Sequence, residues 1–158
     1  MTNGERAYEA MQAALGQPEG SGDWLEIDQA RIDAFAEVSG DHQFIHVDPE
    51  ACKTQSPYGV PIAHGFLTLS LLTKLMETVP QAPERREGVV MGINYGFEKV
   101  RFVTPVKVGS KVRASSVLKA VEPKDANTLQ VTRTVTVEIE GEAKPALVAD
   151  WVTRAVYS

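Results

Sequence analysis

The chain has 158 residues, of which 43% are hydrophobic and 23% charged, a composition that supplies the core of one ordinary domain and excludes a disordered, collagen-like or disulfide-stapled chain. Sixteen Lys and Arg against 21 Asp and Glu give a net charge of −5. No basic stripe compensates for that charge, so we expect no nucleic-acid partner. The single cysteine, Cys52, can form neither an internal disulfide nor a thiolate metal site and is interpreted as a small semi-buried apolar group.

Neither a secretory signal nor a membrane span is indicated. Residues 1–16 contain no apolar run flanked by basic residues. The longest apolar stretch, residues 62–79, is interrupted by His, Lys, Glu, Ser and Thr, whereas a membrane span needs about 20 mostly apolar residues. We therefore expect a cytoplasmic protein with no membrane partner.

Residues 1–22 are expected to form an N-terminal arm, followed by one domain of residues 23–158. Within the arm, residues 5–15 predict a short helix. The Gly, Pro and Ser residues at 17–22 are expected to stop regular structure there. The arm has too few apolar side chains to build a second core, so we assign no further domain.

A short strand and a capped helix are predicted next. Residues 23–27 predict the strand, with Trp24 as a buried anchor. Asp28 has the side chain of an N-cap, and apolar residues at helical spacing follow over residues 29–38. Gly40 then provides a helix stop, because Gly adopts a positive φ at little cost.

A long irregular segment spans residues 40–61. It contains two Pro-containing turns and two of the three histidines, His42 and His46. Asp48 is expected to cap one helical turn that starts at Pro49. Because long loops in compact domains are often functional, this segment is the first place to look for a site.

The rest of the chain predicts one helix and several strands. Residues 61–79 are apolar on nearly all helical faces, which is typical of a buried helix, and Pro80 closes it. Four β-rich runs follow, at residues 88–105, 111–121, 128–140 and 146–157. The third alternates Val131, Val135, Val137 and Ile139 with Thr and Glu residues, which indicates one buried face. We predict an α+β fold in which an antiparallel sheet wraps around a long central helix.

Asp41 and His46 are the candidate catalytic residues. An Asp and a His that converge on one water can orient it and move its proton. If residues 42–46 run extended, His42 and His46 point the same way. Spacing alone also fits structural roles, with Asp41 bonding local amides and His46 satisfied in the core. A metal site of His42, His46 and Asp48 is a weaker alternative, because no fourth ligand is evident.

The residues Ala-His-Gly-Phe at 63–66 form a second candidate element. Backbone N–H groups in the first turn of a helix are unpaired, and Gly65 lets a ligand approach them closely. A thioester carbonyl that gains enolate character would be stabilised there. Gly65 equally fits a role in tight helix–sheet packing, and His64 is either a structural neighbour or part of the cleft lining.

Residues 35–51 (FAEVSGDHQFIHVDPEA) and 62–70 (IAHGFLTLS) together resemble the MaoC-like dehydratases, the (R)-specific enoyl-CoA hydratases of the hot-dog fold. The family motif runs approximately Gly-Asp-X-Asn-Pro-aliphatic-His-X-Asp. Its Asp falls on Asp41 and its His on His46. Gln and Phe stand where the motif has Asn and Pro. A subgroup with Gln and an aromatic residue there, and a later Asn-Tyr-Gly like that at residues 94–96, is more similar still.

The resemblance implies a homodimer with continuous sheets and the reversible hydration of trans-2-enoyl-CoA to (R)-3-hydroxyacyl-CoA, a reaction of fatty acid metabolism. Asp41 and His46 would hold the water, and the N–H of Gly65 would hold the thioester oxygen. No cofactor and no metal are expected, because the thioester already polarises the alkene.

Four further residues are assigned to substrate binding on the same basis: Gln43, His64, Ser70 and Asn94. Three basic residues are candidates for CoA phosphates or are simply solvated charges: Lys99, Arg101 and Lys107. Two alternatives remain open. One is thioester hydrolysis by a hot-dog acyl-CoA thioesterase, and the other is a non-catalytic acyl-CoA-binding protein.

Overall fold

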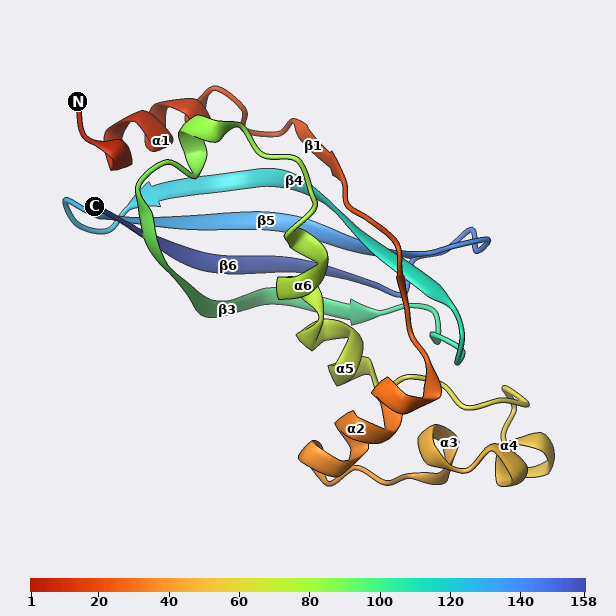
Figure 1. The fold of residues 1–158 in the computed structure, drawn as a ribbon. Coiled ribbons are helices and arrows are strands. Elements are labelled where there is room, and N and C mark those ends of the chain that lie inside the picture. Colours follow the sequence, from red (N-terminus) through yellow and green to blue (C-terminus); the bar gives the residue numbers. More distant parts are fainter.

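The computed structural model describes residues 1–158, in which an antiparallel sheet curves around a layer of short helices (Figure 1). The elements in chain order are α1 (Asn3–Gln12), β1 (Pro18–Ser21), β2 (Leu25–Glu26), α2 (Gln29–Ser39), α3 (Phe44–Val47), α4 (Pro49–Gln55), α5 (Gly65–Ser70), α6 (Leu72–Met76), the 3-10 helix η1 (Pro83–Arg85), β3 (Val89–Phe102), β4 (Lys111–Pro123), β5 (Thr128–Ile139) and β6 (Leu147–Tyr157). The predicted α+β class is confirmed.

The sheet has the order β1-β4-β5-β6-β3, and β2 pairs with β4 beside β1. All of these pairs are antiparallel. The four β-rich runs of the sequence are the four long strands. In β5 the predicted alternation is confirmed, because its inward residues are fully or almost fully buried: Val131, Val135, Val137 and Ile139. β3 forms the far edge of the sheet and pairs with β6 alone.

The prediction of one helix over residues 61–79 is wrong in extent. Helical structure begins at Gly65 and is divided into α5 and α6 at Leu71. Upstream, the N–H of Ile62 bonds to the carbonyl of Ile45 and that of Ala63 to the carbonyl of Val106. These bonds to neighbouring segments hold the chain out of a helix. None of the helices has the length and apolar composition needed to cross a membrane.

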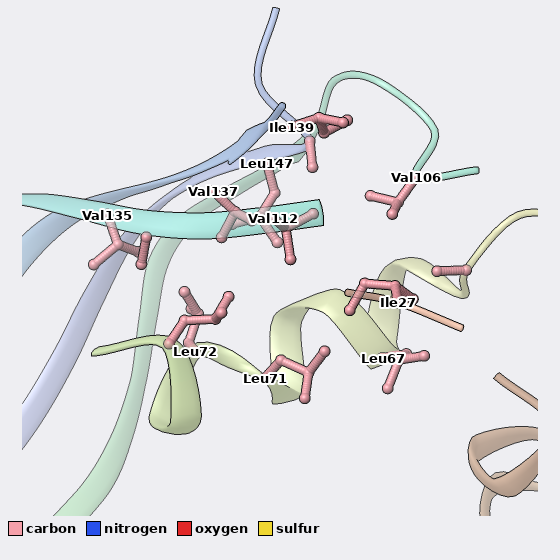
Figure 2. Packing of buried hydrophobic residues seen from close by; sticks show 14 of the residues in the cluster. Ile27, Leu67, Leu71, Leu72, Val106, Val112, Val135, Val137, Ile139 and Leu147 are labelled. Atoms are coloured by element: carbon pink, nitrogen blue, oxygen red, sulfur yellow. The ribbon is translucent and has the colours of Figure 1, made fainter. Parts of the chain in front are cut away.

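The main core lies between the sheet and the α5–α6 layer. Figure 2 shows Val135, Val137 and Leu147 of the sheet facing the helical residues Leu71 and Leu72. Both leucines are almost completely buried, at 8% and 1% exposure. Burying one leucine contributes about 1.5–3 kcal/mol, so this contact stabilises the packing of the helical layer on the sheet.

The N-terminal residues pack against the sheet. Ala7 and Met11 of α1 are buried in a second cluster with residues of β4, β5 and β6. The prediction that residues 17–22 lack regular structure is wrong, since β1 pairs with β4 there. A register shift between Pro18 and Gly20 and the φ of 111° at Gly20 let the strand include both residues. The domain boundary after residue 22 stays a prediction.

A buried ionic network joins β1 to the rest of the sheet. The side chain of Glu19 is 2% exposed. It accepts hydrogen bonds from Arg85 Nη1 at 3.0 Å, Arg133 Nε at 2.8 Å and Ser116 Oγ at 2.9 Å. One buried carboxylate therefore pairs with two largely buried guanidinium groups.

Trp24 is not the buried anchor that the sequence suggested. Its side chain is 37% exposed, and the Arg113 guanidinium lies 4.4 Å from its ring centroid. Ile27 is completely buried instead. The strand β2 is only two residues long, so the buried apolar position falls just after it.

Candidate active site

Asp41 lies directly after the end of α2. Gly40 ends the helix with a φ of 78°, and its N–H bonds to the carbonyl of Ala36, as the predicted stop requires. The next turn is held by side chains, since Ser39 Oγ accepts from the N–H of Asp41 at 3.3 Å. Asp41 Oδ1 in turn accepts from the N–H of Gln43 at 3.2 Å. One carboxylate oxygen of Asp41 is thus engaged locally, and Oδ2 is directed elsewhere.

His46 belongs to the short helix α3, so the extended conformation considered for residues 42–46, which would point His42 and His46 the same way, is not adopted. The N–H of His46 bonds to the carbonyl of Gln43, which closes the helical turn. Asp48 then caps α4 by accepting from the N–H of Ala51 at 3.0 Å, as predicted. The helical turn separates the two histidines of this segment: His46 is 6% exposed, whereas the ring of His42 is half exposed and lies 3.9 Å from Glu37.

The two candidate catalytic side chains converge. His46 Nδ1 lies 2.7 Å from the carbonyl oxygen of Ile62. Because a carbonyl only accepts hydrogen bonds, Nδ1 carries the proton, and in the neutral ring Nε2 has a free lone pair. That Nε2 is 3.9 Å from Asp41 Oδ2. The carboxylate is 49% exposed and the imidazole 8%, so the pair lies where a buried base meets solvent.

His64 lies behind this pair. It is 2% exposed, and its Nε2 donates to the backbone carbonyl of Asp41 at 2.9 Å. Its ring stacks on that of His46 with centroids 3.9 Å apart and an interplanar angle of 23°. Phe35 packs against His64 at 4.9 Å between centroids. Of the two roles left open by the sequence, this is the position of a structural neighbour.

The metal-ligand set suggested by the sequence is not assembled. Asp48 is engaged as a helix cap and His42 faces Glu37. Instead Asp41, His46 and His64 each bring one potential ligand atom within 4.8 Å of the others. The tertiary fold brings His64 to this cluster, and its spacing in the sequence does not predict that position.

Gly65 is the first residue of α5 and lines a cavity of about 320 Å³. Ile62, Ala63, Phe102 and Val103 are among its other lining residues. The N-cap, His64, makes no side-chain capping bond, and first-turn N–H groups have no intrahelical partner. Asp41 and His46 do not line the cavity themselves. They adjoin it through Ile62, whose carbonyl holds His46.

Comparison with known proteins identifies the family. A sequence model described as "MaoC like domain" matches residues 10–140. The chain belongs to the MaoC-like domain family.

Two curated relatives of this MaoC-like chain match over most of their length. Nodulation protein N of Rhizobium leguminosarum bv. viciae is 50% identical over 139 residues, covering 88% of this chain and 84% of the relative. The 3-hydroxyacyl-thioester dehydratase Z of Mycobacterium tuberculosis is 48% identical over 146 residues, covering 92% and 93%.

Solved structures confirm the hot-dog fold. The (R)-hydratase PhaJ1 from Pseudomonas aeruginosa superposes with a TM-score of 0.68 at 25% identity, covering 91% of this chain and 83% of that one. The (R)-hydratase of A. caviae, which is involved in PHA biosynthesis, gives 0.64 at 26% identity, covering 88% and 94%. The resemblance inferred from the two sequence motifs is therefore confirmed.

The other predicted substrate contacts are scattered over this MaoC-like chain. Gln43 adjoins the pair and is exposed. Ser70 Oγ donates to the carbonyl of Leu67 at 2.7 Å. Asn94 Oδ1 accepts from Trp151 Nε1 at 2.8 Å and lines a separate cavity of about 330 Å³. Only Gln43 and His64 are therefore brought to Asp41 and His46.

Sequence reasoning missed the carbonyl of Ile62, which fixes the tautomer of His46. A backbone group carries no compositional signal, so only the fold could place it. It also missed Phe102, whose ring carbons would lie 3.1 Å from a Cβ at residue 65. The close-packing role considered for Gly65 therefore coexists with its place in the cavity wall.

Proposed function

We propose that this protein hydrates trans-2-enoyl-CoA reversibly to (R)-3-hydroxyacyl-CoA. Support comes from two relatives whose names specify a 3-hydroxyacyl-thioester dehydratase and an (R)-hydratase. The observation that carries the proposal is the convergence of Asp41 Oδ2 and His46 Nε2 at 3.9 Å, with the histidine tautomer set by Ile62.

The spacing of the pair suits one water molecule. Hydrogen bonds of about 2.8 Å from one oxygen to each of two atoms 3.9 Å apart would meet at about 90°. Such a water donates one proton to His46 Nε2 and the other to Asp41 Oδ2. As its oxygen attacks the β-carbon, Nε2 takes the first proton and then delivers it to the α-carbon. The second proton stays on the new hydroxyl group, so the pair returns to its starting state.

The thioester oxygen is assigned to the N–H of Gly65. Negative charge grows on that oxygen as the enolate forms, and a positioned donor stabilises it. Because α5 has only six residues, we attribute this effect to the single N–H group and not to a helix macrodipole. The thioester would occupy the 320 Å³ cavity, with the alkene directed past Ile62 toward the pair.

Two substitutions test the assignment. Asp41→Asn and His46→Ala are expected to fold normally and to lose hydration of crotonyl-CoA by about 10²–10⁴-fold. His42→Ala is the matched control, because His42 lies in the same segment but faces Glu37. Loss of the conjugated thioester absorbance without release of thiol, with an (R)-product, supports hydration. Release of thiol identifies a thioesterase, and near-full activity of either variant contradicts the mechanism.

We also propose that two copies pair along β3. This strand is 14 residues long, lies at the sheet edge and is exposed along most of its length. Its apolar side chains are prominent there, with Val90 at 64%, Met91 at 51% and Tyr95 at 58% exposure. A long apolar edge strand invites pairing with another chain, and a β3–β3 contact would continue the sheet across both copies.

Light scattering on the purified protein tests the dimer. The wild type is expected at twice the chain mass. The double substitution Val90→Lys with Met91→Lys is expected to give a monomer, because two cations on each copy would face one another across the strand pair. A wild-type monomer at micromolar concentration would contradict the proposal.

A further inference from the structure

We infer that His64 is a positioning residue of the active site: it holds Asp41 and His46 in register with each other and with the Gly65 N–H. The inference rests on the proposed function, in which those groups handle the water and the thioester oxygen. His64 does not line the cavity and is 2% exposed, so it acts through its neighbours and not on the substrate.

His64 contacts both members of the pair by different means. Its Nε2–H donates to the carbonyl of Asp41 at 2.9 Å, which fixes the backbone from which the carboxylate projects. Its ring lies face to face with His46, 3.9 Å between centroids. A movement of the His64 ring therefore changes the separation of Asp41 Oδ2 and His46 Nε2, which is the separation that a bridging water must match.

The same residue connects the pair to the proposed oxyanion donor. His64 is the N-cap of α5, and the next residue in the chain is Gly65. The Asp41–His46 segment and α5 belong to separate stretches of the chain, so a contact across them is needed to fix their distance. Ile62 bonds to Ile45 and to His46, and the hydrogen bond from His64 to Asp41 adds the contact that reaches the residue carrying the carboxylate.

The remaining ring nitrogen argues against a simple space-filling role. His64 Nδ1 is buried and has no hydrogen-bond partner. An unsatisfied buried acceptor costs free energy that an apolar side chain of similar shape would avoid. Phe35 already provides an aromatic ring on this side of His64. Leaving Nδ1 unpaired costs free energy, and the hydrogen bond from Nε2–H to the Asp41 carbonyl is the reason we infer for keeping a histidine here.

Three substitutions separate the donor from the ring. His64→Gln keeps a donor near the position of Nε2, His64→Asn is an amide too short to reach the Asp41 carbonyl, and His64→Phe keeps the ring without a donor. Ser116→Ala is the control, because it removes a buried hydrogen bond to Glu19 away from the site. For each variant, kcat and KM for crotonyl-CoA hydration and the thermal midpoint are measured.

Loss of positioning should lower kcat and leave KM within about twofold, since a displacement of about 1 Å can cost about 10²-fold in rate. We expect His64→Phe and His64→Asn to lose about 10–100-fold in kcat and His64→Gln to recover about tenfold over His64→Asn. Ser116→Ala should lower the thermal midpoint and keep wild-type kcat. If the Phe variant does not fold, the comparison of Gln with Asn still decides.

Two outcomes overturn the inference and are distinguishable. Wild-type kcat in His64→Asn, or equal kcat in the Gln and Asn variants, while Asp41→Asn is inactive, rejects the positioning role and leaves the proposed function intact. Full activity in Asp41→Asn and His46→Ala rejects the proposed function and the positioning role with it.

Discussion

Substituting Gly65 by Ala should separate activity from stability. A Cβ at this position would lie 3.1 Å from Phe102 Cδ1 and Cε1, a few tenths of an ångström inside normal contact. Because Phe102 is 52% exposed, its ring can move away at little cost. Ala in place of Gly also favours a helix by up to about 1 kcal/mol. The two effects oppose each other, so the net change in unfolding free energy should stay within about 1 kcal/mol.

The effect on hydration should be much larger. The new methyl group would occupy the approach to the Gly65 N–H, and loss of one oxyanion donor costs up to about 10²–10³-fold in rate. We expect kcat/KM for crotonyl-CoA to fall by at least about tenfold, with an unfolding midpoint close to that of the wild type. Adding Phe102→Ala removes the steric contact and should not restore activity. Undiminished kcat/KM in Gly65→Ala, or full restoration in the double variant, would refute the assignment of the thioester oxygen to Gly65.

Three further outcomes are expected elsewhere in the fold. Hydrogen bonding from Lys119 holds the pKa of Asp150 below its ordinary value of about 3.9. The ionised carboxylate therefore stabilises the fold above about pH 4, and this stabilisation is lost as pH falls through the folded-state pKa. The free energy of unfolding should thus fall less steeply with acidification in Asp150→Asn than in the wild type. Burial raises the pKa of the Cys52 thiol, so Ellman's reagent should react only after unfolding. Glu19→Gln leaves two largely buried guanidinium groups without their anionic partner and should cost about 3–5 kcal/mol by urea denaturation.

Local sequence signals predicted the elements that depend on local chemistry. The caps at Asp28 and Asp48 and the stop at Gly40 involve groups within four residues of one another, and all three are confirmed. The buried face of β5 also followed from its own alternation. Where the sequence interpretation was wrong, distant partners decided. The helix over residues 61–79 starts late because Val106 takes the N–H of Ala63.

The candidate site likewise has one part that the local sequence predicts and another that only the fold brings together. Asp41 and His46 were found from a motif, because both lie in one short segment with the right residue types. Their mutual geometry depends on the carbonyl of Ile62 and the ring of His64, which come from the segment that leads into α5. These partners are 16 and 23 residues away in the chain. No periodicity links the two segments, so only the packed structure identifies which groups orient the pair.

The departure from the family pattern at Gln43 and Phe44 has a backbone explanation. Phe44 is the first residue of α3, a position where the N–H has no intrahelical partner and where Pro is therefore readily accommodated. Gln43, with φ −55° and ψ 138°, already has the extended conformation that a following Pro would require. The backbone at Phe44 would thus accept the Pro of the motif. The turn that brings His46 toward Asp41 depends on that backbone and on the bond from the Gln43 N–H to Asp41 Oδ1, which neither replacement removes. Side chains at these two positions can therefore differ from the motif while the backbone that sets the spacing of the two proton-handling atoms is kept.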